Sequence, residues 1–106
     1  MGATVVPENF AAWIDTMPLA DPKLIVTGTV EVPTSGWAVA LVEANPQGIV
    51  PTVLILDLSI TRPGGMVLEV ITQEPVRFEK PKSSNYQGVT IRHGGGEFTI
   101  PVKTVS

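Results

Sequence analysis

Cysteine is absent from this chain of 106 residues. Without thiols there is no disulfide, no thiolate nucleophile and no cysteine-ligated metal site. Histidine occurs once, at position 93. A metal site would therefore need carboxylates from elsewhere, and a general base at His93 would need a nucleophile and an orienting acid, for which no motif is present. We expect neither a cofactor nor a bound metal.

Charged residues are also scarce, at 16% of the chain, and the seven basic residues are scattered. With a net charge of −3, non-specific nucleic-acid binding is not expected, because it needs lysine and arginine to neutralise phosphates. No apolar run of about 18 residues is present, so no transmembrane helix is predicted. The ten glycines and ten prolines separate short elements along the whole chain, which is typical of a folded domain.

Catalytic motifs are missing as well. The carboxylates include no close pair such as DxD or ExE, and no serine lies in a GxSxG context, so neither metal-dependent, glycosidase-type nor serine-hydrolase chemistry is supported. We therefore expect a protein that is not an enzyme. Asp57 is unusual because it lies inside an apolar strand: it is either a buried acid with a raised pKa or, as we prefer, a surface acid paired with a cross-strand Lys or Arg.

One segment has helical periodicity, residues 8–17 (ENFAAWIDTM). Its large apolar residues recur at i, i+3, i+4 and i+7 and predict a short helix that Pro18 ends; they are Phe10, Trp13, Ile14 and Met17. We expect this helix to pack on the domain's own sheet, with partner binding as the alternative. Residues 1–22 then form an N-terminal segment, and residues 23–106 form the β domain.

From residue 23 onward, apolar residues alternate with a period of two, the pattern of half-buried strands. Turn-forming residues separate these runs. The expected strands are 24–32, 37–41, 52–60, 66–73, 76–79, 86–92 and 97–105, with Pro75 breaking or bulging the chain. The pattern predicts an all-β fold, an antiparallel β-sandwich of about seven strands with immunoglobulin-like topology; a small open barrel is the alternative.

Four apolar side chains are expected on the outward face of the third and fourth strands: Val53, Ile55, Val67 and Ile71. An apolar face directed away from the core needs a cover. We expect the N-terminal helix to supply it; otherwise a second copy of the chain would do so in a homodimer.

The segment RHGGGEF, residues 92–98, combines the histidine with three consecutive glycines. Glycine loops that cradle phosphate lead into a helix, whereas residues 97–100 alternate as a strand does. We therefore predict a tight hairpin that uses positive φ angles, with His93 solvated at the end of a strand.

The remaining candidate is a binding surface. If the strands run up and down in succession, the loops 33–36, 61–65 and 80–85 share one end of the domain. The opposite end then carries 44–51, 73–75 and 93–96. The first end combines polar loops with rigid aromatic residues, as many binding sites do, and its expected binding residues are Thr34, Ser35, Trp37, Arg62, Lys80, Lys82 and Tyr86. If Pro75 only bulges one long strand, the later loops exchange ends; Trp37 could also be a core residue.

The stretch PTSGW (33–37) resembles the T-G-G-Y type turn of small bacterial exported domains similar to the C-terminal domain of the protease-complex-associated protein PrcB. The likeness extends to Arg62-Pro63-Gly64 and to the T-x-x-P segment at 72–76 and covers about residues 30–80. Ser35 replaces a glycine of that pattern, and Trp37 replaces a tyrosine. The resemblance implies a non-catalytic, extracytoplasmic domain that binds another protein.

We therefore expect a non-enzymatic module that binds a protein partner. The alternative is a small-molecule or carbohydrate-binding domain in which Trp37 or Tyr86 serves as a stacking platform. The lack of cysteine fits the cytoplasm and the exported compartments equally, and only the resemblance favours a periplasmic or extracellular location.

Overall fold

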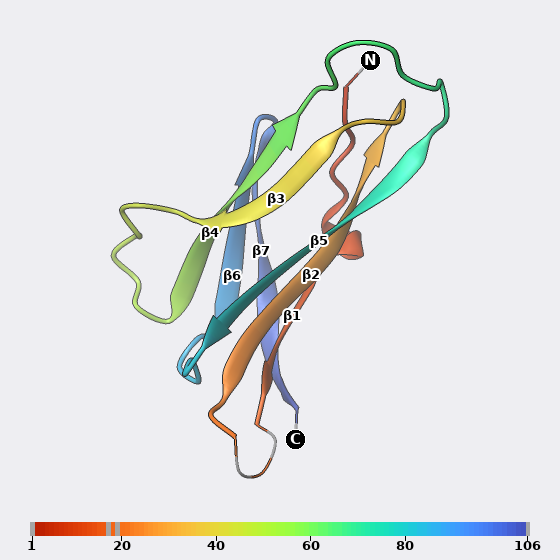
Figure 1. Cartoon of the computed structure of the whole chain (residues 1–106). Coiled ribbons are helices and arrows are strands. Elements are labelled where there is room, and N and C mark those ends of the chain that lie inside the picture. The colour runs from red at the N-terminus through yellow and green to blue at the C-terminus, as the bar shows by residue number, and fades with distance from the viewer. Residues whose placement is uncertain (1, 17, 19, 106) are drawn as a thin grey trace.

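The computed structural model describes residues 2–16, 18 and 20–105, which form an all-β fold (Figure 1). The strands are β1 (Ala11–Asp15), β2 (Lys23–Val32), β3 (Ala38–Glu43), β4 (Val53–Thr61), β5 (Thr72–Pro81), β6 (Gly88–His93) and β7 (Gly96–Val105). A short 3-10 turn, η1 (Pro7–Asn9), precedes β1. Over these described ranges, no helix is long and apolar enough to cross a membrane.

The strands form one continuous sheet in the order β3-β4-β6-β7-β1-β2-β5. Four neighbouring pairs are antiparallel, but β1 runs parallel to β7 and β4 runs parallel to β6. The prediction of a purely antiparallel arrangement is wrong at these two pairings. The parallel pairs arise because β1 and β4 each lie beside a strand that is distant in sequence, whereas tight turns join only antiparallel neighbours.

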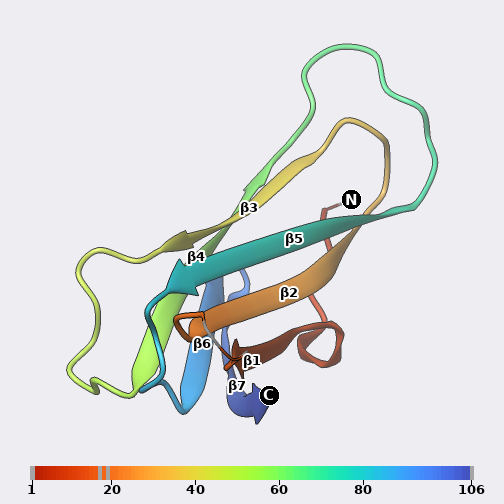
Figure 2. The same ribbon diagram turned by 60° about the horizontal axis from the view of Figure 1, so that its bottom comes forward.

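The sheet curls until its two edge strands approach each other, so that it is nearly barrel-shaped (Figures 1 and 2). The edge strands β3 and β5 are connected by an ion pair in which Lys80 Nζ lies 2.8 Å from Glu43 Oε1. This ion pair crosses the seam of the sheet, the line along which the edge strands β3 and β5 face each other. The fold therefore resembles the open barrel more than a sandwich of two separate layers.

The core fills the inside of this curl. Alternate residues of the strands point inward, as the period-two pattern predicted; the fully buried ones include Leu24, Val26, Val30, Leu54, Leu56, Val89 and Ile91. Burial of each such aliphatic side chain contributes about 1.5–3 kcal/mol. Trp37 is 9% exposed and belongs to this core cluster, in agreement with the interpretation of Trp37 as a core residue.

The predicted helix over residues 8–17 is wrong. Residues 11–15 form β1, in which Ala12 and Ile14 are buried while Trp13 lies on the other face. The alanine at position 12 makes a period-two pattern possible with Phe10 and Ile14, and pairing with β2 and β7 selects it over the helical pattern. Met17, part of the predicted apolar stripe, lies outside the described residues.

The predicted strand at 66–73 is also wrong, because residues 62–71 are a loop. The next strand is a single long one, β5, in which exposed Pro75 pairs with Thr29 of β2. Among the described strands, β5 lies at an edge of the sheet and has hydrogen bonds to β2 alone. A proline can therefore be accommodated where its missing N–H faces away from the ladder.

This long strand decides which loops share an end. β2 ends and β5 begins at the same end of the sheet, as the pairing of Val32 with Thr72 shows. The loops 33–37, 62–71 and 94–95 therefore lie at one end, called the Trp37 end. The loops 44–52 and 82–87 lie at the opposite end, called the Lys80 end, so the loops at 80–85 and 93–96 exchange places relative to the up-and-down prediction.

The four predicted outward apolar residues do not form one face. Val53 and Ile55 lie in β4, whereas Val67 and Ile71 belong to the 62–71 loop at the Trp37 end. Within the part of the chain that the structure describes, no helix covers either pair, since residues 11–15 are a strand within the sheet. A homodimer through all four residues therefore has no continuous surface to use.

Candidate functional site

Trp37 anchors the candidate site at the Trp37 end. Its indole Nε1–H donates to Thr34 Oγ1 at 2.9 Å, and the Thr34 hydroxyl in turn donates to the carbonyl of Ser35 at 3.1 Å. A buried indole N–H needs such a partner. Packing and this hydrogen bond together hold the 33–37 loop against the core.

The 33–37 loop is joined directly to the 62–71 loop. The backbone N–H of Ser35 donates to the Leu68 carbonyl, and the N–H of Leu68 donates to Ser35 Oγ, both at 2.9 Å. Gly36 has a φ of 85°, and a Cβ there would lie 2.9 Å from Pro63 Cβ. Position 36 thus requires glycine both for its left-handed backbone and for the close approach of the two loops.

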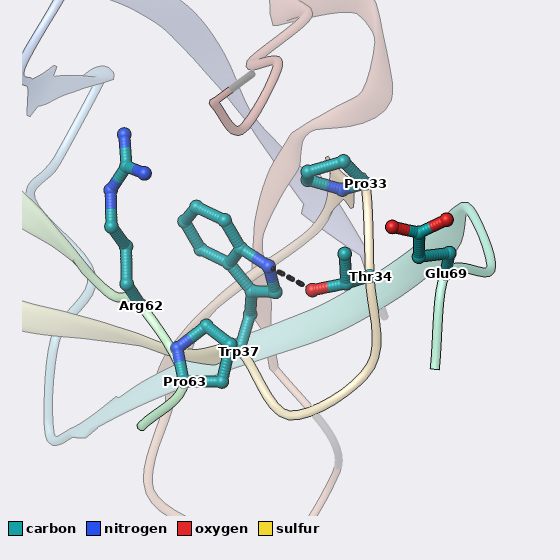
Figure 3. Close-up of a pocket in the computed structure, with 6 residues that line it drawn as sticks. All are labelled: Pro33, Thr34, Trp37, Arg62, Pro63 and Glu69. Carbon is teal, nitrogen blue, oxygen red and sulfur yellow. Dashed lines mark hydrogen bonds between the residues drawn. The ribbon is translucent and has the colours of Figure 1, made fainter. Parts of the chain in front are cut away.

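Arg62 and Glu69 complete a pocket of about 490 Å³ around Trp37, which Figure 3 shows together with Pro33, Thr34 and Pro63. The Arg62 guanidinium carbon lies 5.5 Å from the centroid of the Trp37 ring, a cation–π distance. In the view of Figure 3, Arg62 and Glu69 lie on opposite sides of the indole. The pocket therefore presents a cation and a carboxylate that are separated by an aromatic wall.

The 62–71 loop carries a cluster of exposed apolar side chains. Met66 is fully exposed, and Leu68 and Ile71 are each about two-thirds exposed. Val70 is exposed as well. This apolar loop adjoins the Trp37 pocket through Leu68 and Glu69.

Four of the seven predicted binding residues lie together at the Trp37 end: Thr34, Ser35, Trp37 and Arg62. The other three, Lys80, Lys82 and Tyr86, lie at the Lys80 end. Lys80 donates to Glu43, and this bond holds the pKa of Lys80 above its ordinary value. The seven residues therefore do not form one surface, because the continuous strand β5 carries the chain to the opposite end.

The β6–β7 hairpin brings His93 to the Trp37 end. The turn forms as predicted, with His93 paired to Gly96 and a φ of 138° at Gly96. His93, Gly94 and Gly95 line a second pocket, of about 410 Å³, together with Trp37 and Arg62. The up-and-down prediction put this hairpin at the end away from Trp37. The structure puts it at the Trp37 end, as the alternative of one long strand through Pro75 requires.

Asp57 is not a buried acid. Arg92 Nε donates to Asp57 Oδ1 at 2.7 Å from the neighbouring parallel strand, and this bond lowers the pKa of Asp57 below its ordinary value. The prediction of a surface acid with a cross-strand partner is confirmed. In the described part of the chain, no three His, Asp or Glu side chains gather as metal ligands would.

A further hollow lies on the outer side of β1 and β7, with a volume of about 490 Å³. Half-buried Trp13 lines it beside Pro7, Pro101 and Lys103. In the sheet, Trp13 lies opposite Lys103 of β7 and Ile25 of β2. Trp13 is thus the tryptophan on the outer face, whereas Trp37 belongs to the core.

Four residues that line the pockets at the Trp37 end were not among the predicted binding residues: Pro33, Pro63, Glu69 and His93. The prolines flank predicted residues and carry a weak signal as turn formers. Glu69 was hidden by the alternating pattern of 66–73, which indicated a strand.

Comparisons of this chain with protein-family models, with curated proteins and with solved structures found no match.

Proposed function

We propose that this protein is a non-enzymatic module that binds a protein partner through the Trp37 end. The observation that carries the proposal is the exposed apolar cluster of the 62–71 loop, Met66, Leu68, Val70 and Ile71. Exposed apolar clusters beside polar groups are typical of protein–protein contact sites. Burial of these side chains against a partner would remove their apolar surface from water.

The anchoring of this loop supports the same proposal. Leu68 is connected to the 33–37 loop by two hydrogen bonds, and Trp37 fixes that loop to the core. A loop held in this way loses less conformational entropy on binding than a free one. The resemblance of residues 33–37, 62–64 and 72–76 to PrcB-like exported domains agrees with a partner-binding, extracytoplasmic role.

Loops at the end of a curled sheet carry the contact residues, as they do in many sandwich domains.

The test places a photo-crosslinking p-benzoylphenylalanine at position 68 of the full chain, in cells that naturally produce the protein. The control places it at position 49, because Ile49 is fully exposed at the Lys80 end. We expect one discrete adduct from position 68 and none from position 49. The adduct should disappear when Met66→Ser and Ile71→Ser are added, since these substitutions remove apolar contact surface. Both side chains are exposed, so their loss leaves the core intact.

Equal adducts from positions 68 and 49 would contradict the proposal. So would an adduct at position 68 that survives the two serine substitutions.

Small-molecule or carbohydrate binding is the second function, and the outer hollow at Trp13 favours it. Trp37 is unsuited to stacking because it is buried beneath Arg62. Trp13 instead lies beside Lys103 in an apolar hollow, and an aromatic face with a nearby polar group suits a sugar ring. If this function is correct, glycan-induced quenching of tryptophan fluorescence is lost in Trp13→Phe and kept in Trp37→Phe; no quenching by any glycan of a panel argues against it.

A further inference from the structure

The pocket at the mouth of the curled sheet combines an apolar lining with basic groups. Its volume is about 410 Å³, within the usual range for small-ligand sites. The apolar lining comes from the N-terminal segment, from β4 and from the core indole: Ala3, Val5, Leu58, Ile60 and Trp37. The polar lining is Arg62, His93 and the turn glycines Gly94 and Gly95.

None of the described residues that line this pocket is acidic, although the chain has ten Asp and Glu residues and a net charge of −3. The other two arginines, Arg77 and Arg92, each bind a carboxylate, at 2.6 and 2.7 Å. Arg62 forms no ion pair with any described residue, and its guanidinium rests over the Trp37 ring. The planar donors of Arg62 therefore lack an anionic partner, and a carboxylate matches their geometry.

His93 supplies a second donor to the same pocket. Its Nδ1 accepts a hydrogen bond from the Gly95 N–H at 3.2 Å. In a neutral imidazole, the nitrogen that does not accept carries the proton, so Nε2 is an N–H donor. The ring is packed 5.9 Å from Phe98, centroid to centroid, which limits its rotation.

We propose that this pocket binds a carboxylate that carries a short branched apolar group. The carboxylate oxygens accept hydrogen bonds from the Arg62 guanidinium and from His93 Nε2–H, and the apolar group contacts Val5, Leu58 and Ile60. A free branched-chain acid and a polypeptide C-terminus that ends in valine or leucine share this chemistry. The inference goes beyond protein docking by the 62–71 loop and does not depend on it.

The test follows the backbone amide resonances and the arginine Nε–H resonances by NMR during titration of the ¹⁵N-labelled full chain. The probes are isovalerate, its amide isovaleramide, a tetrapeptide ending in leucine with a free carboxylate, the same peptide amidated, and inorganic phosphate. We expect both carboxylates to shift Gly94, Gly95 and the Arg62 Nε–H, with dissociation constants in about the millimolar range for so small a ligand. The two amides should cause no saturable shift.

Arg62→Gln should weaken carboxylate binding by about tenfold or more, as expected for loss of a charged hydrogen-bonding partner, and Arg62→Lys should have an intermediate effect. Arg62 is exposed, so neither substitution disturbs the core. Lys82→Gln is the matched control, since Lys82 is an exposed cation at the opposite end. It should leave the affinity unchanged.

The two ligand sources are distinguished by affinity. Peptide binding at least about tenfold tighter than that of isovalerate assigns the site to a polypeptide C-terminus, and equal affinities assign it to a free acid. The proposal is overturned if the amides bind as well as the carboxylates, if phosphate binds more tightly than either, or if Arg62→Gln has no effect. Failure here leaves the crosslinking result at Leu68 untouched, because that experiment depends on the exposed apolar side chains of the 62–71 loop and not on the donors of Arg62 and His93.

Discussion

At the scale of single residues, Gly28 is the most sterically constrained glycine of the fold. A Cβ at this position would overlap the ring of Phe10, which is buried and packs 5.4 Å from the Phe98 ring. Gly28→Ala should lower the free energy of unfolding by about 1–3 kcal/mol, the usual cost of overpacking. Urea unfolding measures this change.

Gly64→Ala is the control, because nothing lies within 4 Å of a Cβ at position 64. Adding Phe10→Leu to Gly28→Ala should recover part of the loss if the aromatic ring causes it. Equal urea midpoints for Gly28→Ala and the unsubstituted protein would show that the ring moves aside without cost.

The Asp57–Arg92 pair gives a pH-dependent prediction. The hydrogen bond from Arg92 lowers the pKa of Asp57 below its ordinary value of 3.8. The pair's contribution to stability is therefore fully present above pH 3.8 and is lost as the pH falls through the lowered value. The difference in unfolding free energy between the unsubstituted protein and Asp57→Asn should shrink in that acid range.

Asp21→Asn provides the comparison for this effect, as Asp21 is exposed and forms no ion pair with a described residue. Its stability difference should show no comparable loss on acidification. If Asp57→Asn and Asp21→Asn behave alike with pH, the Arg92 hydrogen bond does not stabilise the folded state.

At the scale of elements, the β6–β7 hairpin depends on one of its three glycines. Gly96 has a φ of 138°, whereas the φ of Gly94 lies outside the left-handed region and its surroundings are open. Gly96→Ala should cost roughly 1–3 kcal/mol through backbone strain, and Gly94→Ala should change stability by less than about 0.5 kcal/mol. Thermal unfolding of the two variants separates them, and equal losses would place the strain elsewhere in the turn.

Elements with one consistent pattern could be predicted from the sequence. In β4, Leu54, Leu56 and Leu58 alternate with half-buried residues, and all three are buried as expected. In residues 8–17 the alanines allow both a helical and a strand pattern, and only pairing with β2 and β7 decides between them. Residues 66–71 alternate in the same way but pair with no strand of the described chain, so most of their apolar side chains, Met66, Leu68, Val70 and Ile71, stay exposed.

At the scale of the whole molecule, strand topology decided which of the predicted binding residues lie together. Thr34 and Trp37 precede β3, and Arg62 follows β4. The antiparallel pairing of β3 with β4 brings them to one end, whatever the later strands do. The positions of Lys80, Lys82 and His93 depend on whether Pro75 ends a strand. Pro75 is exposed on an edge strand and does not end it, so β5 continues to Pro81. The later loops therefore lie at the ends opposite to those of the up-and-down prediction.

The seam of the curled sheet provides the prediction for the whole molecule. Lys80 and Glu43 connect the edge strands β5 and β3, and their bond raises the pKa of Lys80 above its ordinary value of 10.5. Their contribution is therefore present below pH 10.5 and lost as the pH rises through the raised value. A double-mutant cycle with Lys80→Met and Glu43→Gln should give a coupling of about 0.2–1 kcal/mol that falls with added salt.

Hydrogen exchange tests whether this ion pair closes the sheet. Loss of Lys80 should speed amide exchange in β3, because the ion pair to Glu43 connects this edge strand to β5, with which it shares no ladder. The control removes Lys23, whose bond to Glu79 at 3.0 Å connects β2 and β5, two strands that already share a ladder. Lys23→Met should leave exchange in β3 unchanged. If both variants leave it unchanged and the coupling energy is zero, packing between β3 and β5 closes the sheet without the ion pair.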